Sequence, residues 1–419
     1  MTQKDDTTFV SIVHPVCCGL DVHKKIIAAC LVFIDEFGNE QHEIRQFGTF
    51  TNDLIELRRW LISHNCPIVA MESTGVYWRP IHNILEGYLD VILVNARHIK
   101  NVPGRKTDIE DSKWLAGLLK HGLLRGSFIP EKDVRTWREL TRMRRTYTES
   151  LGDYKRRVHK LFETANIKID SVVSDLFGLT GRNLMKLLCE KDRELNIKDI
   201  ADCAKGRLKA KVPELFLSIQ GFFEDHHRFQ LTSLLTTIST IETQISSITK
   251  RLDSLIAPHL NLIDRLDEVP GINKVSAQSI LSEVGITLDE FITMAALASW
   301  AGLCPGNNES AGKRKNGRSS VRNHPLKTIL IEVAWAAVKK KGSYYRAKYY
   351  KLKSRRGAKK AIVAIAHRIL KAIYCIIKNG DRFKDPGESY LLENDKKRAL
   401  KRLKQQAKMM GMELVAIPA

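Results

Sequence analysis

The sequence predicts an N-terminal α/β domain, a long coiled-coil arm and a mainly helical C-terminal domain. Short apolar strands alternate with helices over the first 125 residues, two long heptad seams follow Pro130, and a further compact helical region follows Pro258. The expected boundaries are residues 1–130 for the first domain, 131–258 for the arm with a helical insert at 166–221, 259–380 for the C-terminal domain, and 381–419 for a basic tail.

The element order of the first domain defines its fold class. Each expected strand is a short run rich in apolar or β-branched residues, and each expected helix has a capping signal or an apolar face. The elements are strands at 16–21, 26–34 and 43–50, a helix capped by Thr51 or Asn52, a strand at 67–71, a helix at 75–88, a strand at 91–94, and a helix opened by Thr107. Three strands followed by helix, strand, helix, strand and helix is the order of the ribonuclease H-like fold.

Four carboxylates stand out in this domain. Asp21 and Glu72 each directly follow an apolar strand, and Asp108 and Asp111 lie one helical turn apart. Acids in a first helical turn are favoured by the helix dipole whatever the function. An acid at the end of an apolar strand is not explained in that way, because burying an unpaired charge is costly. Together the four predict a site for divalent metal, which prefers oxygen ligands, and so a metal-dependent phosphodiesterase.

Composition favours a nucleic-acid partner. The formal net charge is +21 and the sequence pI is about 9.6, a balance that attracts polyanions through counterion release. No apolar run reaches the length of a membrane span, and the polar start is not a signal peptide. The eight cysteines are scattered without a Cys-x-x-Cys pair. We therefore expect buried thiols in a reducing cytoplasm and no zinc site.

The arm is predicted by two a/d seams, from Trp137 to Leu161 and from Leu231 to Leu255. Seams of similar length predict either an antiparallel hairpin within one chain or arms that pair between protomers. Arg144 interrupts the first seam and is expected to fix its register. We assign no chemistry to the insert at 166–221, where Gly178 and Gly181 are expected to break helices.

The C-terminal domain contains two candidate phosphate-binding segments. Residues 266–277 resemble a helix-hairpin-helix with Asn273 in place of the usual second glycine, although ordinary helix-turn-helix packing explains the pattern nearly as well. Residues 306–313 differ from a P-loop in spacing, and Arg314 stands where Ser or Thr should follow the lysine, so an ATPase site is rejected. What remains is a flexible loop in which Ser310 lies among cations. The basic stretch from Lys313 to Lys371, with four tyrosines, suits backbone contacts and base stacking.

Four motifs together resemble the IS110 and IS1111 transposase family. They are Gly19-Leu20-Asp21-Val22-His23-Lys24, Met71-Glu72-Ser73-Thr74-Gly75-Val76-Tyr77-Trp78, Lys106-Thr107-Asp108-Ile109-Glu110-Asp111, and Ala301-Gly302-Leu303-Cys304-Pro305 with Gly312-Lys313. The resemblance implies a RuvC-like domain whose DEDD quartet is Asp21, Glu72, Asp108 and Asp111, a coiled-coil arm, and a transposase domain with a nucleophilic serine. That serine is Ser310, with Ser319 and Ser320 nearby.

The resemblance also implies partners and chemistry. These are Mg²⁺, donor and target DNA, a structured noncoding guide RNA, and a homodimer or homotetramer. Strand exchange would proceed through a covalent phosphoserine, and the expected nucleic-acid-binding residues are Lys106, Lys313, Arg314, Arg318 and Arg322. The alternatives are a RuvC-like nuclease that uses water, a sugar-kinase or actin-like ATPase lacking its second phosphate loop, and a non-catalytic RNA- or DNA-binding protein.

Overall fold

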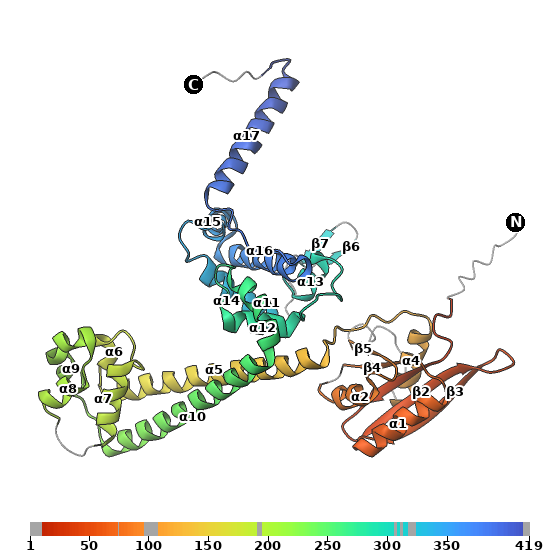
Figure 1. Ribbon diagram of the computed structural model, residues 1–419, viewed down its shortest axis with the longest axis horizontal. Coiled ribbons are helices and arrows are strands. Elements are labelled where there is room, and N and C mark those ends of the chain that lie inside the picture. The colour runs from red at the N-terminus through yellow and green to blue at the C-terminus, as the bar shows by residue number, and fades with distance from the viewer. Residues whose placement is uncertain are drawn as a thin grey trace. The chain divides into compact units, whose positions relative to one another are not determined.

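The computed structural model describes residues 11–73, 75–95, 108–190, 195–305, 308–310, 313–316 and 324–413. The side chains of Asp108, Asn394 and residues 308–310 and 313–316 are outside this description. The chain forms two compact units, Met1–Ile129 and Pro130–Ala419, and Figure 1 shows the elements of each. None of the helices in the described ranges is both long enough and apolar enough to cross a membrane.

The N-terminal unit is built on a mixed five-stranded sheet. Its strands lie in the order β3-β2-β1-β4-β5. The first three strands pair antiparallel, whereas β4 is parallel to both β1 and β5. The strands are β1 Cys17–Val22, β2 Ile26–Ile34, β3 Glu40–Gly48, β4 Ile68–Glu72 and β5 Asp90–Val94. The ribonuclease H-like fold predicted from the element order is confirmed.

Helices cover both faces of this sheet. The helices are α1 Thr51–Ser63, α2 Trp78–Leu85 and α4 Asp108–Lys120. Leu20 and Met71 belong to one apolar core together with side chains of α1 and α2. Cys17 and Ala70 belong to a second core together with Ala116 and Leu119 of α4. Because side chains alternate along a strand, successive residues within β1, and likewise within β4, lie on opposite faces of the sheet.

The start of α1 differs from the prediction. Neither Thr51 nor Asn52 caps the helix; the N-cap residue is Phe50. The Asp53 carboxylate accepts a hydrogen bond of 3.1 Å from the Phe50 backbone N–H, and Gly48 makes room for it, since a Cβ there would lie 2.1 Å from Asp53 Oδ2. The acid in the third helical position thus satisfies the backbone N–H of the N-cap residue, as in one half of a capping box.

The cysteines behave as reduced thiols. All eight are free, and Cys17, Cys18, Cys30 and Cys66 are buried in the sheet unit. Burial raises the pKa of Cys30 and Cys66 to about 11 and that of Cys17 to about 12. The protonated thiols act as small apolar side chains.

The second unit is organised around two long antiparallel helices, α5 Lys132–Thr164 and α10 Asp225–Ile256, which lie side by side within the chain (Figure 1). The residues of both predicted seams face inward, since Trp137, Val158, Leu231 and Leu252 are buried. Arg144 is buried as well, and its guanidinium donates to Gln278 Oε1 at 2.9 Å. The hydrogen bonds of this arginine join α5 to α12.

The insert packs against the far end of this hairpin in a core that it shares with Phe162 of α5 and Leu231 of α10. Gly178 precedes a helix, as expected, but Gly181 lies inside α7 and does not break it. A Cβ on Gly181 would lie 1.9 Å from Leu176 O, so this glycine is required for close packing. The elements of the insert are α6 Ile169–Val172, α7 Leu179–Glu190, α8 Ile197–Cys203, η1 Gly206–Lys211 and α9 Val212–Ser218.

The C-terminal part is mainly helical, as predicted. Its elements are η2 Ala257–His259, α11 Leu260–Asp267, α12 Lys274–Val284, α13 Met294–Trp300, β6 Asn308–Ser310, β7 Lys313–Asn316, α14 Pro325–Ala337, α15 Tyr344–Arg356, α16 Ala358–Asn379 and α17 Ser389–Met409. The segment expected as a basic tail thus includes a long helix, α17.

The turn between α11 and α12 differs from the helix-hairpin-helix expectation. Asn273 has an extended φ of −128°, and its side chain caps α12 by accepting from Ser276 N. The left-handed residue is Gly271, with φ +89°. A Cβ on Gly271 would lie 2.3 Å from Val333 O of α14. The glycine therefore allows the turn to pack against α14, which is a packing role.

Candidate functional site

Two of the predicted acids lie at neighbouring positions on one face of the sheet. Leu20 of β1 is paired with Met71 of β4 in parallel register, so Asp21 and Glu72 follow side by side. Cys17 and Ala70 pack in the same core as residues of α4. Because side chains alternate along a strand, Asp21 lies on the same face as Cys17, and Glu72 on the same face as Ala70. Both acids therefore lie on the face that packs against α4. Asp21 is 9 % exposed, and Glu72 is half-buried.

Helix α4 runs antiparallel to β1, and its direction brings its first turn toward these acids. Cys17 Sγ contacts Ala116 O at 3.6 Å, whereas a Cβ on Gly19 would lie 2.2 Å from Ser112 O. Moving back along α4 from Ala116 to Ser112 therefore follows β1 from Cys17 toward Asp21. The absence of a side chain at Gly19 allows the helix backbone to lie directly on the strand.

The other two acids belong to this first turn. Asp108 is the first residue of α4, and its side chain is outside the described ones. Asp111 is exposed and lies one turn before Leu115, which is buried against the sheet. The structure thus brings β1, β4 and the start of α4, which carry the four acids, to one edge of the sheet.

His23 fixes the orientation of Asp21. Its Nε2 lies 3.0 Å from Asp21 Oδ2, and the two side chains are 49 % and 12 % exposed. Asp21 and His23 are two residues apart at the end of β1, so their side chains lie on the same side of the chain. This i, i+2 spacing is the sequence signal for the contact. As a partner of Asp21, His23 can hold one carboxylate oxygen in place.

The carboxylates of the described acids do not lie close enough together to form a compact cluster of ligand atoms. Among the residues that the structure describes, Asp21, Glu72 and Asp111 do not form a group with ligand atoms within 4.8 Å of one another. Like charges repel at such distances unless a cation compensates them. The donor set still fits a hard divalent cation, because it consists of carboxylates from three separate elements.

The predicted serine lies on a small hairpin and not in a flexible loop. Ser310 is the last residue of β6 and is paired with Lys313 of β7, and Glu309 is paired with Arg314. The hairpin belongs to the C-terminal unit, whereas the acids belong to the N-terminal unit. Lys106, Arg318 and Arg322, together with the alternative serines Ser319 and Ser320, lie outside the described residues.

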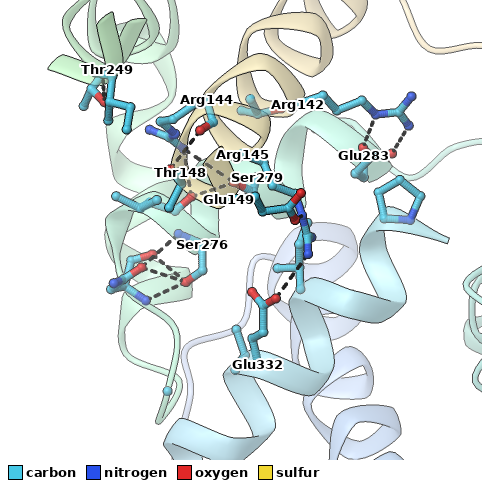
Figure 2. A pocket seen from close by; sticks show the side chains of 18 residues that line it. Arg142, Arg144, Arg145, Thr148, Glu149, Thr249, Ser276, Ser279, Glu283 and Glu332 are labelled. Carbon is cyan, nitrogen blue, oxygen red and sulfur yellow. Dashed lines mark hydrogen bonds and ion pairs between the residues drawn. The ribbon is translucent and has the colours of Figure 1, made fainter. Parts of the chain in front are cut away.

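A cavity of about 490 Å³ lies between α5, α10, α12 and α14 (Figure 2). Arg144 faces it, and burial lowers the pKa of this guanidinium while Asp253 opposes that effect. Arg145 bridges Glu149 and Glu332 at 2.8 and 3.2 Å. The arginines of this cavity are therefore engaged by protein groups, and they tie α5 to α12 and α14.

Arg142 is expected to be the most important of these arginines for stability. It makes two hydrogen bonds of 2.9 Å to the Glu283 carboxylate, which is 2 % exposed. Arg142→Ala should destabilise the helical unit by about 3 kcal/mol, because it leaves a buried carboxylate without its main partner. The change is measured as the shift in the urea unfolding midpoint.

Arg145→Ala is the matched control. Its partners Glu149 and Glu332 have side chains that are 64 % and 65 % exposed, so its loss should cost less than about 1 kcal/mol. Equal destabilisation by the two substitutions would show that burial of Glu283 does not govern this pair.

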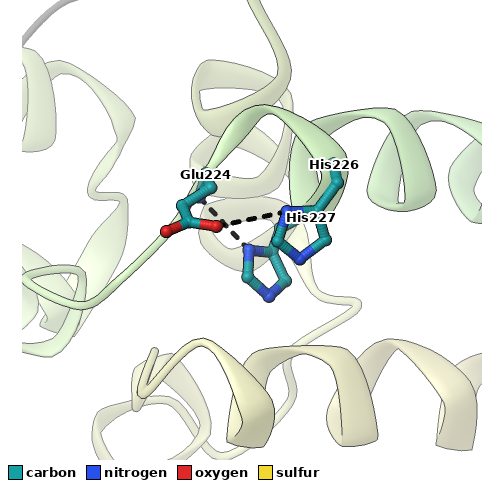
Figure 3. Close-up of side chains that lie close together, drawn as sticks. All are labelled: Glu224, His226 and His227. Carbon is teal, nitrogen blue, oxygen red and sulfur yellow. Dashed lines mark hydrogen bonds and ion pairs between the residues drawn. The ribbon is translucent and has the colours of Figure 1, made fainter.

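A second cluster of potential metal ligands lies at the start of α10 (Figure 3). The ligand atoms of Glu224, His226 and His227 are within 4.8 Å of one another. The Glu224 backbone N–H donates to His227 Nδ1 at 3.2 Å, and His226 Nδ1 lies 3.3 Å from the Glu224 carboxylate. These contacts cap the helix, and the positive end of the helix dipole disfavours a cation there.

Comparison with known proteins gives two matches along the chain. Residues 18–167 match a family model of transposases named for the DEDD motif and IS110. Residues 263–351 match the model described as the transposase IS116/IS110/IS902 family. A search of the curated proteins finds no match.

The two matches occur in the order expected from the sequence motifs. The first includes nearly all of the sheet with Asp21 and Glu72 and the whole of α4 and α5. The second includes α12 and the β6–β7 hairpin. The chain therefore belongs to the IS110 family of transposases, with a DEDD RuvC-like domain at its N-terminus and the second transposase domain toward its C-terminus.

Proposed function

We propose that this transposase is an RNA-guided DNA recombinase that mobilises an insertion sequence by Mg²⁺-dependent strand cleavage and exchange through a covalent phosphoserine. The observation that carries the proposal is the meeting of β1, β4 and the start of α4 at one sheet edge, in a chain that also has the second family domain. The first feature supplies carboxylates to bind metal, and the second supplies the serine hairpin.

The acids Asp21, Glu72, Asp108 and Asp111 would hold Mg²⁺. When bound, the metal supplies Lewis-acid polarisation of the scissile phosphate and charge stabilisation of the leaving oxygen. His23 keeps one oxygen of Asp21 oriented through its 3.0 Å contact. Close packing at Gly19 keeps the first turn of α4 against the same strand. The chain's own contribution is a preorganised set of anionic oxygens.

Ser310 would act as the nucleophile. Its Oγ forms a bond to phosphorus and loses its proton, while the phosphodiester bond to the leaving oxygen breaks and that oxygen leaves as a hydroxyl. The phosphoserine ester keeps the free energy of the original bond, so the strand can be rejoined without ATP. Lys313 and Arg314 on the paired strand, with Arg318 and Arg322 further along, would neutralise phosphate charge.

The acids and the serine belong to separate compact units. In a homodimer or homotetramer, one protomer can supply the acids while another supplies the serine. Cleavage then requires assembly on DNA, which protects the host genome from isolated protomers.

A guide RNA accounts for sequence choice. The net charge of +21 suits binding to nucleic-acid backbones, and base pairing with donor and target DNA delegates sequence recognition to the RNA. Lys106, which lies just before the DEDD helix, is expected to contact this backbone.

The proposal predicts that the purified protein carries one specific RNA. Sequencing of RNA that copurifies with the chain should give a structured transcript matching the flank of its own coding region, and adding this RNA with donor and target DNA should restore Mg²⁺-dependent recombination. A heterogeneous cellular RNA pool, with recombination indifferent to the added transcript, would remove the guide from the mechanism.

A further inference from the structure

A second cavity lies in the C-terminal part of the helical unit, apart from the residues assigned to cleavage. It has a volume of about 750 Å³ and is bounded by α15, α16 and the segment at 381–386 that follows α16. Its lining combines aromatic rings and cations, in particular Tyr344, Tyr345, Arg368, Lys371, Phe383 and Lys384. Ligand pockets for small molecules usually have volumes of roughly 300–1,000 Å³, which is enough for one nucleotide.

The walls of this cavity are held in place by two carboxylates. Asp385 Oδ1 accepts hydrogen bonds from Tyr344 N at 3.0 Å and from Gly387 N at 2.9 Å. Glu268 Oε2 accepts from Phe383 N at 3.2 Å. The segment after α16 is thus attached both to the start of α15 and to the end of α11. The cavity is a built feature of the fold, because specific hydrogen bonds hold the segment that forms one of its walls.

The aromatic wall has one ring available for stacking. Tyr344 and Tyr345 are 9 % and 3 % exposed, so the stacking predicted for these tyrosines from sequence is limited by burial. Phe383 is half-buried, and its ring is nearly parallel to that of Tyr345, with 17° between the planes and 6.0 Å between the centroids. Tyr345 therefore packs nearly parallel to Phe383, and Phe383 is the more accessible of these rings for stacking with a base.

One of the four cations in the lining, Arg382, pairs with Glu268 at 3.7 Å, and one acid, Asp381, also lines the cavity. In the described part of the chain, no ion pair joins a carboxylate to Arg368, Lys371 or Lys384, and the Arg368 guanidinium lies 5.6 Å from the Tyr344 ring centroid. The pKa of His367 is lowered by burial and by the nearby Arg368 and Lys371. The pKa of Lys348 is lowered by burial and by Arg368. The local potential is thus positive and suits a phosphate.

We propose that this cavity binds one unpaired nucleotide of a single-stranded nucleic acid, with its base on Phe383 and its phosphate near Arg368, Lys371 and Lys384. A base inside a duplex is stacked on both faces and paired along one edge, so it cannot enter a pocket without being extruded. The site therefore selects unpaired strands. The proposal deepens the nucleic-acid binding proposed above, but it requires neither metal nor Ser310.

The test measures binding of the full-length protein without Mg²⁺ and in the presence of chelator, so that catalysis has no influence. Fluorescence anisotropy is recorded with labelled single-stranded RNA and DNA of one sequence and with the corresponding blunt DNA duplex. Phe383→Leu should weaken single-strand binding about 5- to 30-fold, with duplex binding within about twofold of wild type. Stronger loss with RNA than with DNA would assign the pocket to the RNA strand, and the reverse would assign it to DNA.

Two matched controls separate the pocket from general effects. Phe229→Leu removes an aromatic ring that is 75 % exposed on α10 and should leave single-strand binding unchanged. Lys371→Gln should make the slope of log K against log salt concentration for single-strand binding shallower by about 1, as expected for the loss of one phosphate contact. Lys198→Gln makes the same charge change at an exposed position of α8 in the insert and should leave the salt dependence unchanged.

A measurement on the wild-type protein keeps the proposal testable if variants fold poorly. A single strand containing 4-thiouracil should crosslink on irradiation to the peptide at 381–386 or to the start of α15. Equal losses for single strand and duplex in Phe383→Leu, or crosslinks confined to other peptides, would overturn the proposal. Either result would leave metal-dependent cleavage and the guide RNA to be judged by their own assays.

Discussion

Asp21→Asn is expected to abolish Mg²⁺-dependent strand exchange while RNA binding stays within a few fold of wild type. The substitution keeps the size of the side chain and its ability to accept from His23, which lies 3.0 Å away. It removes one negative charge from the proposed metal ligands, so charge stabilisation of the transition state is lost. We expect recombination to fall by roughly 10³-fold or more.

Asp90→Asn provides the matched control. This substitution makes the same chemical change on the same sheet, but Asp90 is an exposed residue at the beginning of β5. Because β5 is parallel to β4, its beginning lies at the opposite edge from Glu72. Full recombination is expected for this variant. If Asp21→Asn were as active as Asp90→Asn, Asp21 would not be a metal ligand.

Ser310→Ala distinguishes covalent exchange from hydrolysis. Without the hydroxyl, no phosphoserine can form, so both the trapped protein–DNA adduct and recombination should be lost by roughly 10⁴-fold. Ser319→Ala and Ser320→Ala test the neighbouring hydroxyls and should retain activity. Cleavage at full rate by Ser310→Ala would identify a nuclease that uses water as its nucleophile.

Gly19→Ala is expected to disrupt the acidic site from within the sheet. The new Cβ would lie 2.2 Å from Ser112 O and 2.5 Å from Ala116 N. Both are backbone atoms of α4, so no side-chain rotation relieves the clash and the helix must move away from β1. We expect a loss of about 1–3 kcal/mol in stability of the N-terminal unit. Recombination should fall at the same time, because Asp108 and Asp111 move with the helix.

Gly117→Ala is the control for the same helix. A Cβ on Gly117 would have nothing within 4 Å, and alanine favours helix by up to about 1 kcal/mol over glycine. Hydrogen exchange should show faster exchange of the amides of β1 and α4 in Gly19→Ala and unchanged or slower exchange in Gly117→Ala. Native exchange and full recombination in Gly19→Ala would mean that close packing at this point does not hold the site together.

Local patterns account for much of what the sequence predicted correctly. The short apolar runs gave the strands at Cys17–Val22 and Ile68–Glu72 and so placed Asp21 and Glu72 at strand ends. The seams gave the inward faces of α5 and α10. These predictions succeed because periodicity reports which side of an element is buried.

Predictions that depended on tertiary neighbours were less accurate. Asn273 stands where a helix-hairpin-helix has its second glycine, but it caps α12, and Gly271 makes the turn against α14. Gly181 was expected to break a helix, but it lies within α7 next to Leu176 O. Propensity describes what a residue tolerates, and the neighbouring element decides how that freedom is used.

By itself, the sequence determined the ribonuclease H-like element order, the two seams and the acids at the strand ends, because each follows from short-range spacing and side-chain chemistry. Only the tertiary structure decided that α4 lies antiparallel to β1 at Gly19, that His23 holds Asp21, and that Arg144 joins α5 to α12. Those contacts join residues through the packing of whole elements, which no local pattern specifies.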